Sequence, residues 1–208
     1  VGQAASNRNT TGNRNSSFGR YAAFYNTTGN NNTAVGYHAS CLNVTGENNT
    51  AVGTNALAAN TASNNTAVGF CSLRSNTTGA YNTALGRQSL FNNTQGAQQV
   101  AIGNRALYYN TTGTYNITIG SASLRYNTAG SNNTALGHNS LLSNTASNNT
   151  AVGFCSLRAN TTATNNTGIG YGALRTNTTG DHNTALGRLA LRDNTTGVRN
   201  TAVGSAAL

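Results

Sequence analysis

The chain contains no proline, no methionine, no tryptophan and no lysine, and only 7% of its residues are charged. Soluble domains typically carry roughly 25% charged residues. A low charge with abundant asparagine and threonine is compatible with a disordered low-complexity tract. No apolar run is long enough for a signal peptide or a membrane helix, so we expect no membrane insertion. The missing methionine leads us to expect a segment of a longer protein.

Acidic residues are almost absent, because Glu47, Asp181 and Asp193 are the only ones. The net charge of +9 therefore comes from arginine alone. Such a balance can indicate a polyanionic partner, or it can be a by-product of having so few acids.

Catalytic and metal-binding constellations are also missing from the sequence. The three histidines fall at different positions of the repeat described below, and no Ser-His-Asp set or carboxylate pair can be assembled. The three cysteines lack the spacing of metal ligands and look like small apolar fillers. We therefore expect no enzyme, no cofactor and no metal site. The residues concerned are His38, His138, His182, Cys41, Cys71 and Cys155.

A short motif, Asn-Thr-Ala-Val-Gly with Leu or Ile in place of Val, recurs along the whole chain. Its glycines, called motif glycines here, return at a constant interval of seventeen positions, shortened by one position at two places. A longer duplication is also present, because Asn60–Arg74 is identical to Asn144–Arg158. The motif glycines are Gly2, Gly19, Gly36, Gly53, Gly69, Gly86, Gly103, Gly120, Gly137, Gly153, Gly170, Gly187 and Gly204.

Stacking the units on the motif glycine gives nearly invariant columns. The residue before this glycine is apolar, the third residue after it is Ala or Ser, and the fourth is mostly Leu. A second asparagine column lies four residues before it and is broken only by Gln99. The seventh residue after it is always asparagine: Asn9, Asn26, Asn43, Asn60, Asn76, Asn93, Asn110, Asn127, Asn144, Asn160, Asn177 and Asn194.

These columns predict two short strands per unit, separated by two glycine-marked corners. Glycine supplies the positive φ of a tight turn, and the second corner carries Gly or the small residues Ser63, Ser147 and Ala163. Thr and Val suit strands. In two units the Thr is replaced by Val100 and Ile117, so we expect the Thr and Val side chains to face inward and the intervening Ala outward.

A single unit of this length cannot bury its few apolar groups alone, whereas stacked units share a continuous core. Aligned asparagines can hydrogen-bond amide to amide along such a stack. We therefore predict an all-β parallel β-solenoid, or β-roll, of about twelve coils over residues 1–208, forming a single rod roughly 58 Å long. A helical solenoid is the competing fold, but the pattern lacks a 3.6-residue period.

The sequence leaves two alternatives for the number of chains in the rod. The small residues two before and three after the motif glycine suit close approach between chains, which favours a homotrimer around a common axis. A monomeric solenoid with a solvent-facing alanine surface is the alternative. Both chain ends fall inside the repeat, which favours a longer fibre or end-to-end filament stacking.

The fifth position after the motif glycine is a candidate contact surface. Arginine alternates there with Phe24, Phe91, Tyr108 and Leu142. One interpretation is a basic and aromatic stripe for acidic glycans or nucleic acid. The other is a long side chain that covers the rim of the core. The arginines are Arg74, Arg125, Arg158, Arg175 and Arg192.

Asn-x-Thr sequons are dense and would accept glycans in a eukaryotic secreted chain. The repeat also generates them by coincidence, and an inward-facing asparagine could not carry a glycan. The candidate acceptors are Asn26, Asn76, Asn110, Asn160, Asn177 and Asn194. Ice binding is a further alternative, disfavoured because the Thr column nine after the motif glycine is broken by Ala62, Gln95, Ala129 and Ala146.

The motif resembles the repeats of bacteriophage tail-fibre proteins. It is also similar to the head repeats of trimeric autotransporter adhesins, best at residues 32–36 and 99–103. The resemblance covers essentially the whole chain. It implies a trimeric, left-handed parallel β-roll on a virion or cell surface that binds host molecules or projects a binding tip. The adhesin repeat is shorter and lacks the second Asn-Thr-Thr-Gly corner.

We therefore expect a structural or adhesive segment of an extracellular fibre, with other copies of itself as partners and host surface glycans as candidate ligands. Nucleic acid is the less favoured polyanion. A glycosylated filament subunit that stacks end to end is the alternative function, and a repetitive surface that binds polyanions or ice is the third.

Overall fold

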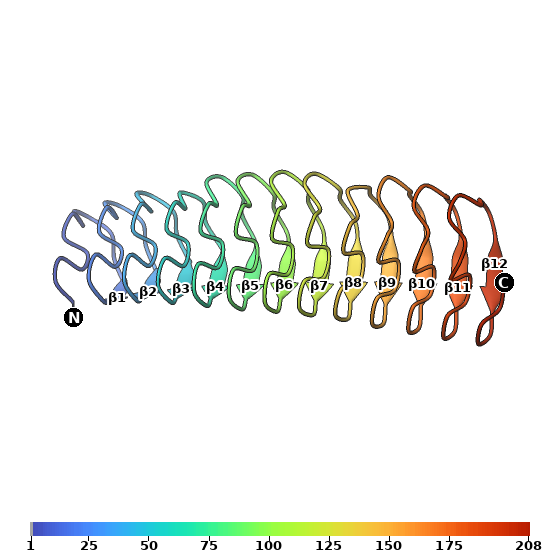
Figure 1. The fold of residues 1–208 in the computed structure, drawn as a ribbon. Coiled ribbons are helices and arrows are strands. Elements are labelled where there is room, and N and C mark those ends of the chain that lie inside the picture. The colour runs from blue at the N-terminus through green and yellow to red at the C-terminus, as the bar shows by residue number, and fades with distance from the viewer. Residues whose placement is uncertain (1) are drawn as a thin grey trace.

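The computed structural model describes residues 2–208 as a row of stacked coils that forms a slightly arched rod (Figure 1). Each coil contributes one three-residue strand, and the strands pair in parallel in chain order as a single sheet. The strands are β1 (Ser16–Phe18), β2 (Thr33–Val35), β3 (Thr50–Val52), β4 (Thr66–Val68), β5 (Thr83–Leu85), β6 (Val100–Ile102), β7 (Ile117–Ile119), β8 (Thr134–Leu136), β9 (Thr150–Val152), β10 (Thr167–Ile169), β11 (Thr184–Leu186) and β12 (Thr201–Val203). The parallel β-solenoid expected from the repeat is confirmed.

Each strand sits in register with its neighbours, so that like residues stack on like residues. Thr33, for example, pairs with Thr50, and Val35 pairs with Val52. The two shortened units keep this register, because Thr50 still pairs with Thr66. The missing residue is therefore absorbed outside the strand, at the second corner.

The predicted inward and outward faces of the strand are wrong and must be exchanged. The central alanine is fully buried in most coils, whereas the flanking residues are partly exposed, with Ile117 and Ile119 at 45% and 43%. The core is narrow and leaves room for only a small group opposite the leucine column. Thr118 takes the alanine place in β7, and its hydroxyl donates to the carbonyl of Val100 at 3.0 Å.

The second strand predicted in each coil is also wrong. The six residues after the motif glycine form a run of turns in which the second and fourth residues have positive φ, as in Cys71 (55°) and Leu73 (47°). A non-glycine residue in this conformation costs on the order of 1–2 kcal/mol. Hydrogen bonds between coils compensate, since the amide of Leu73 donates to the carbonyl of Ser89 at 3.0 Å.

The leucine column fills the centre of the coil between this run of turns and the strand. Leu57, Leu107 and Leu174 have no exposed surface, and the same holds for most alanines and serines three residues after the motif glycine. The small residues that suggested contact between chains therefore line the core of a single chain. Burial of each leucine contributes roughly 1.5–3 kcal/mol.

The two glycine corners have different physical causes. The motif glycines have φ near 130°, as in Gly86 (129°), a conformation that side chains rarely adopt. At the second corner Gly29 has no positive φ, but an added Cβ would lie 2.4 Å from the carbonyl oxygen of Gly46. The second corner therefore requires glycine for space, and the prediction of a positive φ there is wrong.

The short coils place alanine, not serine, at this crowded corner. The carbonyl oxygen of Ala62 accepts from the amides of Asn49 and Asn60, as glycine carbonyls do in other coils. Ser63 instead lies one step further on, where its hydroxyl accepts from the amide of Glu47 at 3.0 Å. The deleted residue is therefore one of the two threonines, and the assignment of Ser63 and Ser147 to the corner is corrected to Ala62 and Ala146.

Candidate functional surfaces

The twelve asparagines of the first column lie inside the second corner, where most of them are buried. The side-chain amide of Asn93 donates to Asn76 Oδ1 at 2.7 Å and to the carbonyl of Gly96 at 2.8 Å. Asn110 in turn donates to Asn93 Oδ1 at 2.8 Å. Each amide thus connects one coil to the next and also closes its own corner.

This column is interrupted at the two short coils and also between Asn26 and Asn43, because Asn26 Oδ1 has no hydrogen-bond partner among residues 2–208. The Asn60 amide reaches Asn43 Oδ1 only at 3.5 Å, and Asn127 Oδ1 has no hydrogen-bond partner among residues 2–208. In both short coils the second asparagine column substitutes. Asn65 donates to Asn60 Oδ1 at 3.3 Å, and Asn149 donates to Asn144 Oδ1 at 3.2 Å.

The second asparagine column forms a more regular set of contacts, whose role the sequence did not reveal. Each Oδ1 accepts from the backbone amide of the next residue in the column, as Asn32 does from Asn49 at 2.9 Å. In most coils its amide donates to the corner carbonyl of the following coil, from Asn32 to Gly46 at 2.8 Å, whereas the side-chain amide of Asn166 has no hydrogen-bond partner among residues 2–208. Gln99 preserves both contacts, with Asn116 and Gly113. The near-invariance of Asn or Gln at this position was the only feature of the sequence that could have indicated this role.

Charge and aromatic rings are concentrated on one long side of the rod. Ten of the twelve arginines and eleven of the fourteen Phe and Tyr residues fall within six residues after a motif glycine. We call the outward side chains of these segments the arginine–aromatic face. The outward Thr and aliphatic side chains of the strands, called the strand face, include no charged residue. The two faces belong to opposite walls of the coil.

Within the arginine–aromatic face, rings and guanidinium groups stack on one another along the rod. Phe91 stacks on Tyr108 with ring centroids 5.1 Å apart, and the Arg74 guanidinium lies 5.6 Å from the Phe91 centroid. Arg125 lies 5.9 Å from the Tyr108 centroid and 5.2 Å from that of Tyr126. The broad faces of these rings are therefore covered by neighbouring side chains.

The other three predicted contact arginines lie in successive coils near the C-terminal end. Arg158, Arg175 and Arg192 line a shallow hollow of about 330 Å³. Arg192 pairs with Asp193 at 2.7 Å, the only salt bridge among residues 2–208. Hydrogen bonding to Arg192 holds the pKa of the Asp193 carboxyl below its ordinary value. The structure thus separates the five predicted arginines into a ring-stacked pair and a group of three.

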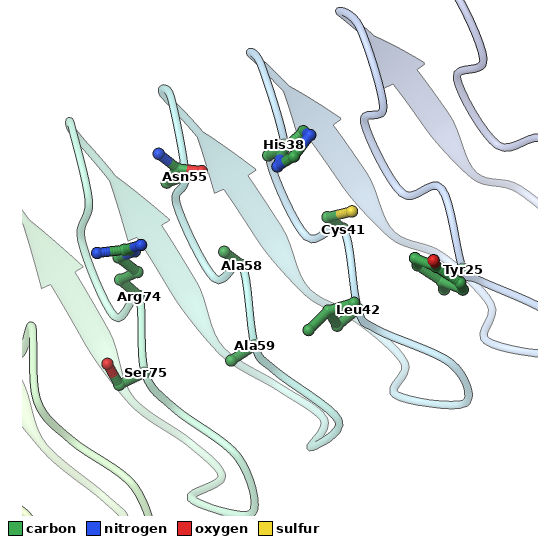
Figure 2. Close-up of a pocket in the computed structure, with 9 residues that line it drawn as sticks. All are labelled: Tyr25, His38, Cys41, Leu42, Asn55, Ala58, Ala59, Arg74 and Ser75. Atoms are coloured by element: carbon green, nitrogen blue, oxygen red, sulfur yellow. The ribbon is translucent and has the colours of Figure 1, made fainter.

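A hollow of about 610 Å³ lies in the arginine–aromatic face where the stacks of large side chains are interrupted. Ala58 and Ala59 occupy the positions that carry Arg125 and Tyr126 four coils later. Figure 2 shows the hollow between Tyr25 at one end and Arg74 at the other. Its remaining lining residues are His38, Cys41, Leu42, Asn55 and Ser75.

An adjoining hollow of about 400 Å³ shares Tyr25, His38 and Cys41 and extends toward Tyr21 and Tyr37. Cys41 is buried, and this burial raises the pKa of its thiol. Because the thiolate is the reactive form of cysteine, burial lowers the reactivity of this thiol at neutral pH. All three cysteines are free thiols.

The six predicted sequon acceptors belong to the first asparagine column. Asn76, Asn110 and Asn160 are fully buried, and their amide nitrogens already donate two hydrogen bonds each. A glycan on any of them would displace the corner. Exposed Asn-x-Thr acceptors do exist, two residues before the strand: Asn31, Asn48, Asn132, Asn148 and Asn165. Their exposure was not apparent from the sequence.

The chain matches no protein-family model, no curated protein and no solved structure. Between residues 2 and 208 we find no helix with the length and apolar character that a bilayer crossing requires. The same residues contain no group of three His, Cys, Asp or Glu side chains that could hold a metal ion. The structure leaves His38, His138 and His182 in separate coils.

Proposed function

We propose that this chain is a structural and adhesive segment of an extracellular fibre, comparable in role to a phage tail fibre or a surface-adhesin stalk. The observation that supports this proposal most is the uniformity of the rod. Every strand keeps the same register with its neighbours, and most coils repeat the same pairs of amide contacts. Such an array gains length with each added coil without changing its cross-section, which suits a spacer that projects a tip.

We propose further that three such chains pack side by side through their strand faces. This face carries exposed aliphatic side chains and no charge, and Leu186, for example, is 45% exposed. Exposed apolar columns of this length favour protein contacts. The homotrimer therefore rests on the strand face, because the alanine columns that first suggested it are buried inside one chain.

The assembly can be tested by light scattering on the purified chain. A homotrimer has three times the mass of 21.3 kDa. Replacing the outward Ile117 and Ile119 with lysine should yield monomers with an unchanged circular dichroism spectrum. The matched control is Tyr115→Lys, which is exposed but lies outside the strand. A wild-type mass of 21.3 kDa at micromolar concentration would contradict the homotrimer.

The fibre role itself is tested by immunogold labelling of intact virions or cells that carry the gene. We expect gold particles along external appendages. Labelling confined to the interior would contradict the proposal.

A glycosylated filament is the second candidate, and the exposed sequons favour it. Asn48 offers its amide to solvent, whereas Asn76 does not. Mass spectrometry of the native protein separates the two functions. Glycans at Asn48 and its equivalents would support the filament, whereas unmodified asparagine throughout would support the bare fibre. Glycans on the first asparagine column would contradict the fold.

A further inference from the structure

We infer that the hollow between Tyr25 and Arg74 is a binding site for an acidic carbohydrate, with a sugar ring seated over the alanines and its carboxylate paired with Arg74. The inference goes beyond the structural role of the rod and does not depend on it. A solitary chain should bind the sugar whether or not it assembles into a fibre.

The shape of the site follows from two small side chains in columns that are otherwise large. Tyr25 and Arg74 lie three coils apart, which corresponds to roughly 14 Å at the spacing of strands. Ala58 and Ala59 leave the intervening surface low (Figure 2). The space suits a short oligosaccharide that lies along the rod axis.

The aromatic end of the hollow provides a surface for a sugar ring. The Arg8 guanidinium lies 4.7 Å from the Tyr25 ring centroid and belongs to the preceding coil. The hollow lies in the coils that follow, and Tyr25 lines its near end together with Leu42, the residue at the same repeat position in the next coil. Leu42, which is 47% exposed, continues the apolar surface. A pyranose presents C–H groups that pack on such a surface.

The opposite end of the hollow provides a positive charge. Arg74 is exposed and forms no salt bridge in residues 2–208. Its guanidinium carbon lies 5.6 Å from the Phe91 ring centroid, over the ring, and its N–H groups remain for a ligand. A planar carboxylate can accept two parallel hydrogen bonds from a guanidinium, which makes a uronic acid a better match than a neutral sugar. Asn55 and Ser75 add further polar groups along the lining.

Nucleic acid fits this face less well. Proteins that bind single strands without sequence preference stack bases on open aromatic faces. Here several rings of the arginine–aromatic face are covered on both sides. Tyr171, for example, lies between Phe154, 5.4 Å away between ring centroids, and Arg188, 5.9 Å from its centroid. Tyr25 alone does not make a track for successive bases.

The test measures binding of a linear tetragalacturonate by isothermal titration calorimetry, with maltotetraose as the neutral probe. Three variants of the full chain are compared with the wild type. Arg74→Gln removes the positive charge. The double variant Ala58→Arg, Ala59→Tyr fills the hollow with the pair that Arg125 and Tyr126 form in the same columns, so the fold should tolerate it.

The matched control is Arg158→Gln. Arg158 ends a segment identical in sequence to the one that ends at Arg74, but Leu142 replaces Ala58 in the coil before it. Circular dichroism verifies that all variants are folded. Arg74→Gln should weaken binding of tetragalacturonate about tenfold, since it removes a charge-assisted hydrogen bond. Arg158→Gln should leave the affinity unchanged.

The double variant separates a shaped site from general charge attraction. Filling the hollow abolishes binding if the site is the one inferred, although the variant adds a positive charge. Stronger binding by the double variant, equal weakening by Arg74→Gln and Arg158→Gln, or equal affinity for maltotetraose would overturn the inference. Absence of any wild-type binding would overturn it too, and would leave the fibre proposal untouched.

Discussion

The substitution Asn93→Ala tests the energetic role of the first asparagine column. Asn93 takes part in three side-chain hydrogen bonds, with Asn76, Gly96 and Asn110. A net contribution of about 1 kcal/mol per bond gives a loss of about 3 kcal/mol. Asn76 Oδ1 would then remain buried without its donor, which costs a further ~1–3 kcal/mol. We expect a destabilisation of roughly 4–6 kcal/mol from these terms.

The neighbouring residue offers a matched control. Asn92 is partly exposed and its side chain makes no hydrogen bond within residues 2–208, so Asn92→Ala should change stability by no more than about 0.5 kcal/mol. Urea unfolding followed by far-ultraviolet circular dichroism gives both free energies. Repeat arrays can unfold in parts, so amide hydrogen exchange around residue 93 should show the same difference locally. If Asn93→Ala were no more destabilising than Asn92→Ala, the column would not hold the coils together.

Other predictions concern the corner, the core and a thiol. Gly86→Ala should lower the melting temperature far more than Gly172→Ala. At Gly86, where φ is 129°, the added Cβ would lie 2.7 Å from a carbonyl oxygen of the next coil, whereas at Gly172 the nearest atom belongs to a flexible leucine side chain. In the monomeric lysine variant, Leu107→Ala should cost about 2–5 kcal/mol in urea unfolding, whereas the outward Ile102→Ala should cost under ~1 kcal/mol. Equal costs in that variant would contradict the assignment of faces. Because burial raises the pKa of the Cys41 thiol, the folded state holds this proton more tightly than the unfolded state does. Alkylation of Cys41 in the native protein should therefore accelerate only above the usual thiol pKa range. The free energy of unfolding should fall as the pH rises through that range. Alkylation of the native protein as fast as in urea would refute burial of this residue.

The sequence predicts the architecture of the rod because its signal is periodic. A glycine that returns at a fixed interval and an unbroken asparagine column specify stacked coils, and parallel pairing in register follows from stacking. The sequence alone could not tell which strand face is buried. Thr and Val share a face by the two-residue period, and hydrophobicity suggests that this face is the inner one. The available volume decides otherwise, since a leucine such as Leu124 fills the coil and leaves room only for alanine opposite it.

The second wall of the coil was equally hidden. Its residues, such as Leu73 and Leu141, have no propensity for positive φ, and only contacts between coils impose that conformation. The conformational cost of positive φ at these leucines can be recognised from the structure but not from the sequence. The hollow at Ala58 is hidden for a different reason. Ala58 and Ala59 are small residues at repeat positions that elsewhere carry long or aromatic side chains. They form a hollow only because Tyr25 and Arg74, three coils apart, lie at its two ends.

The outward Thr side chains of the strand face are the ones that bear on the ice-binding alternative. The Thr column turned outward is the one in the strands, exemplified by Thr33 and Thr50, and not the broken column after the second corner. Val100 and Ile117 interrupt this column in adjacent coils. A thermal-hysteresis assay on the monomeric lysine variant and on the wild type would show whether this face shapes ice, and activity in the wild type would favour the ice-binding alternative.

A cryo-electron microscopy map of the purified assembly would show how the chains are arranged. We predict three parallel rods whose coils repeat at about 4.8 Å along the axis. Their strand faces should meet at the common axis, and their arginine–aromatic faces should point outward. A single rod with its strand face in solvent, or a particle without the axial repeat, would contradict this arrangement.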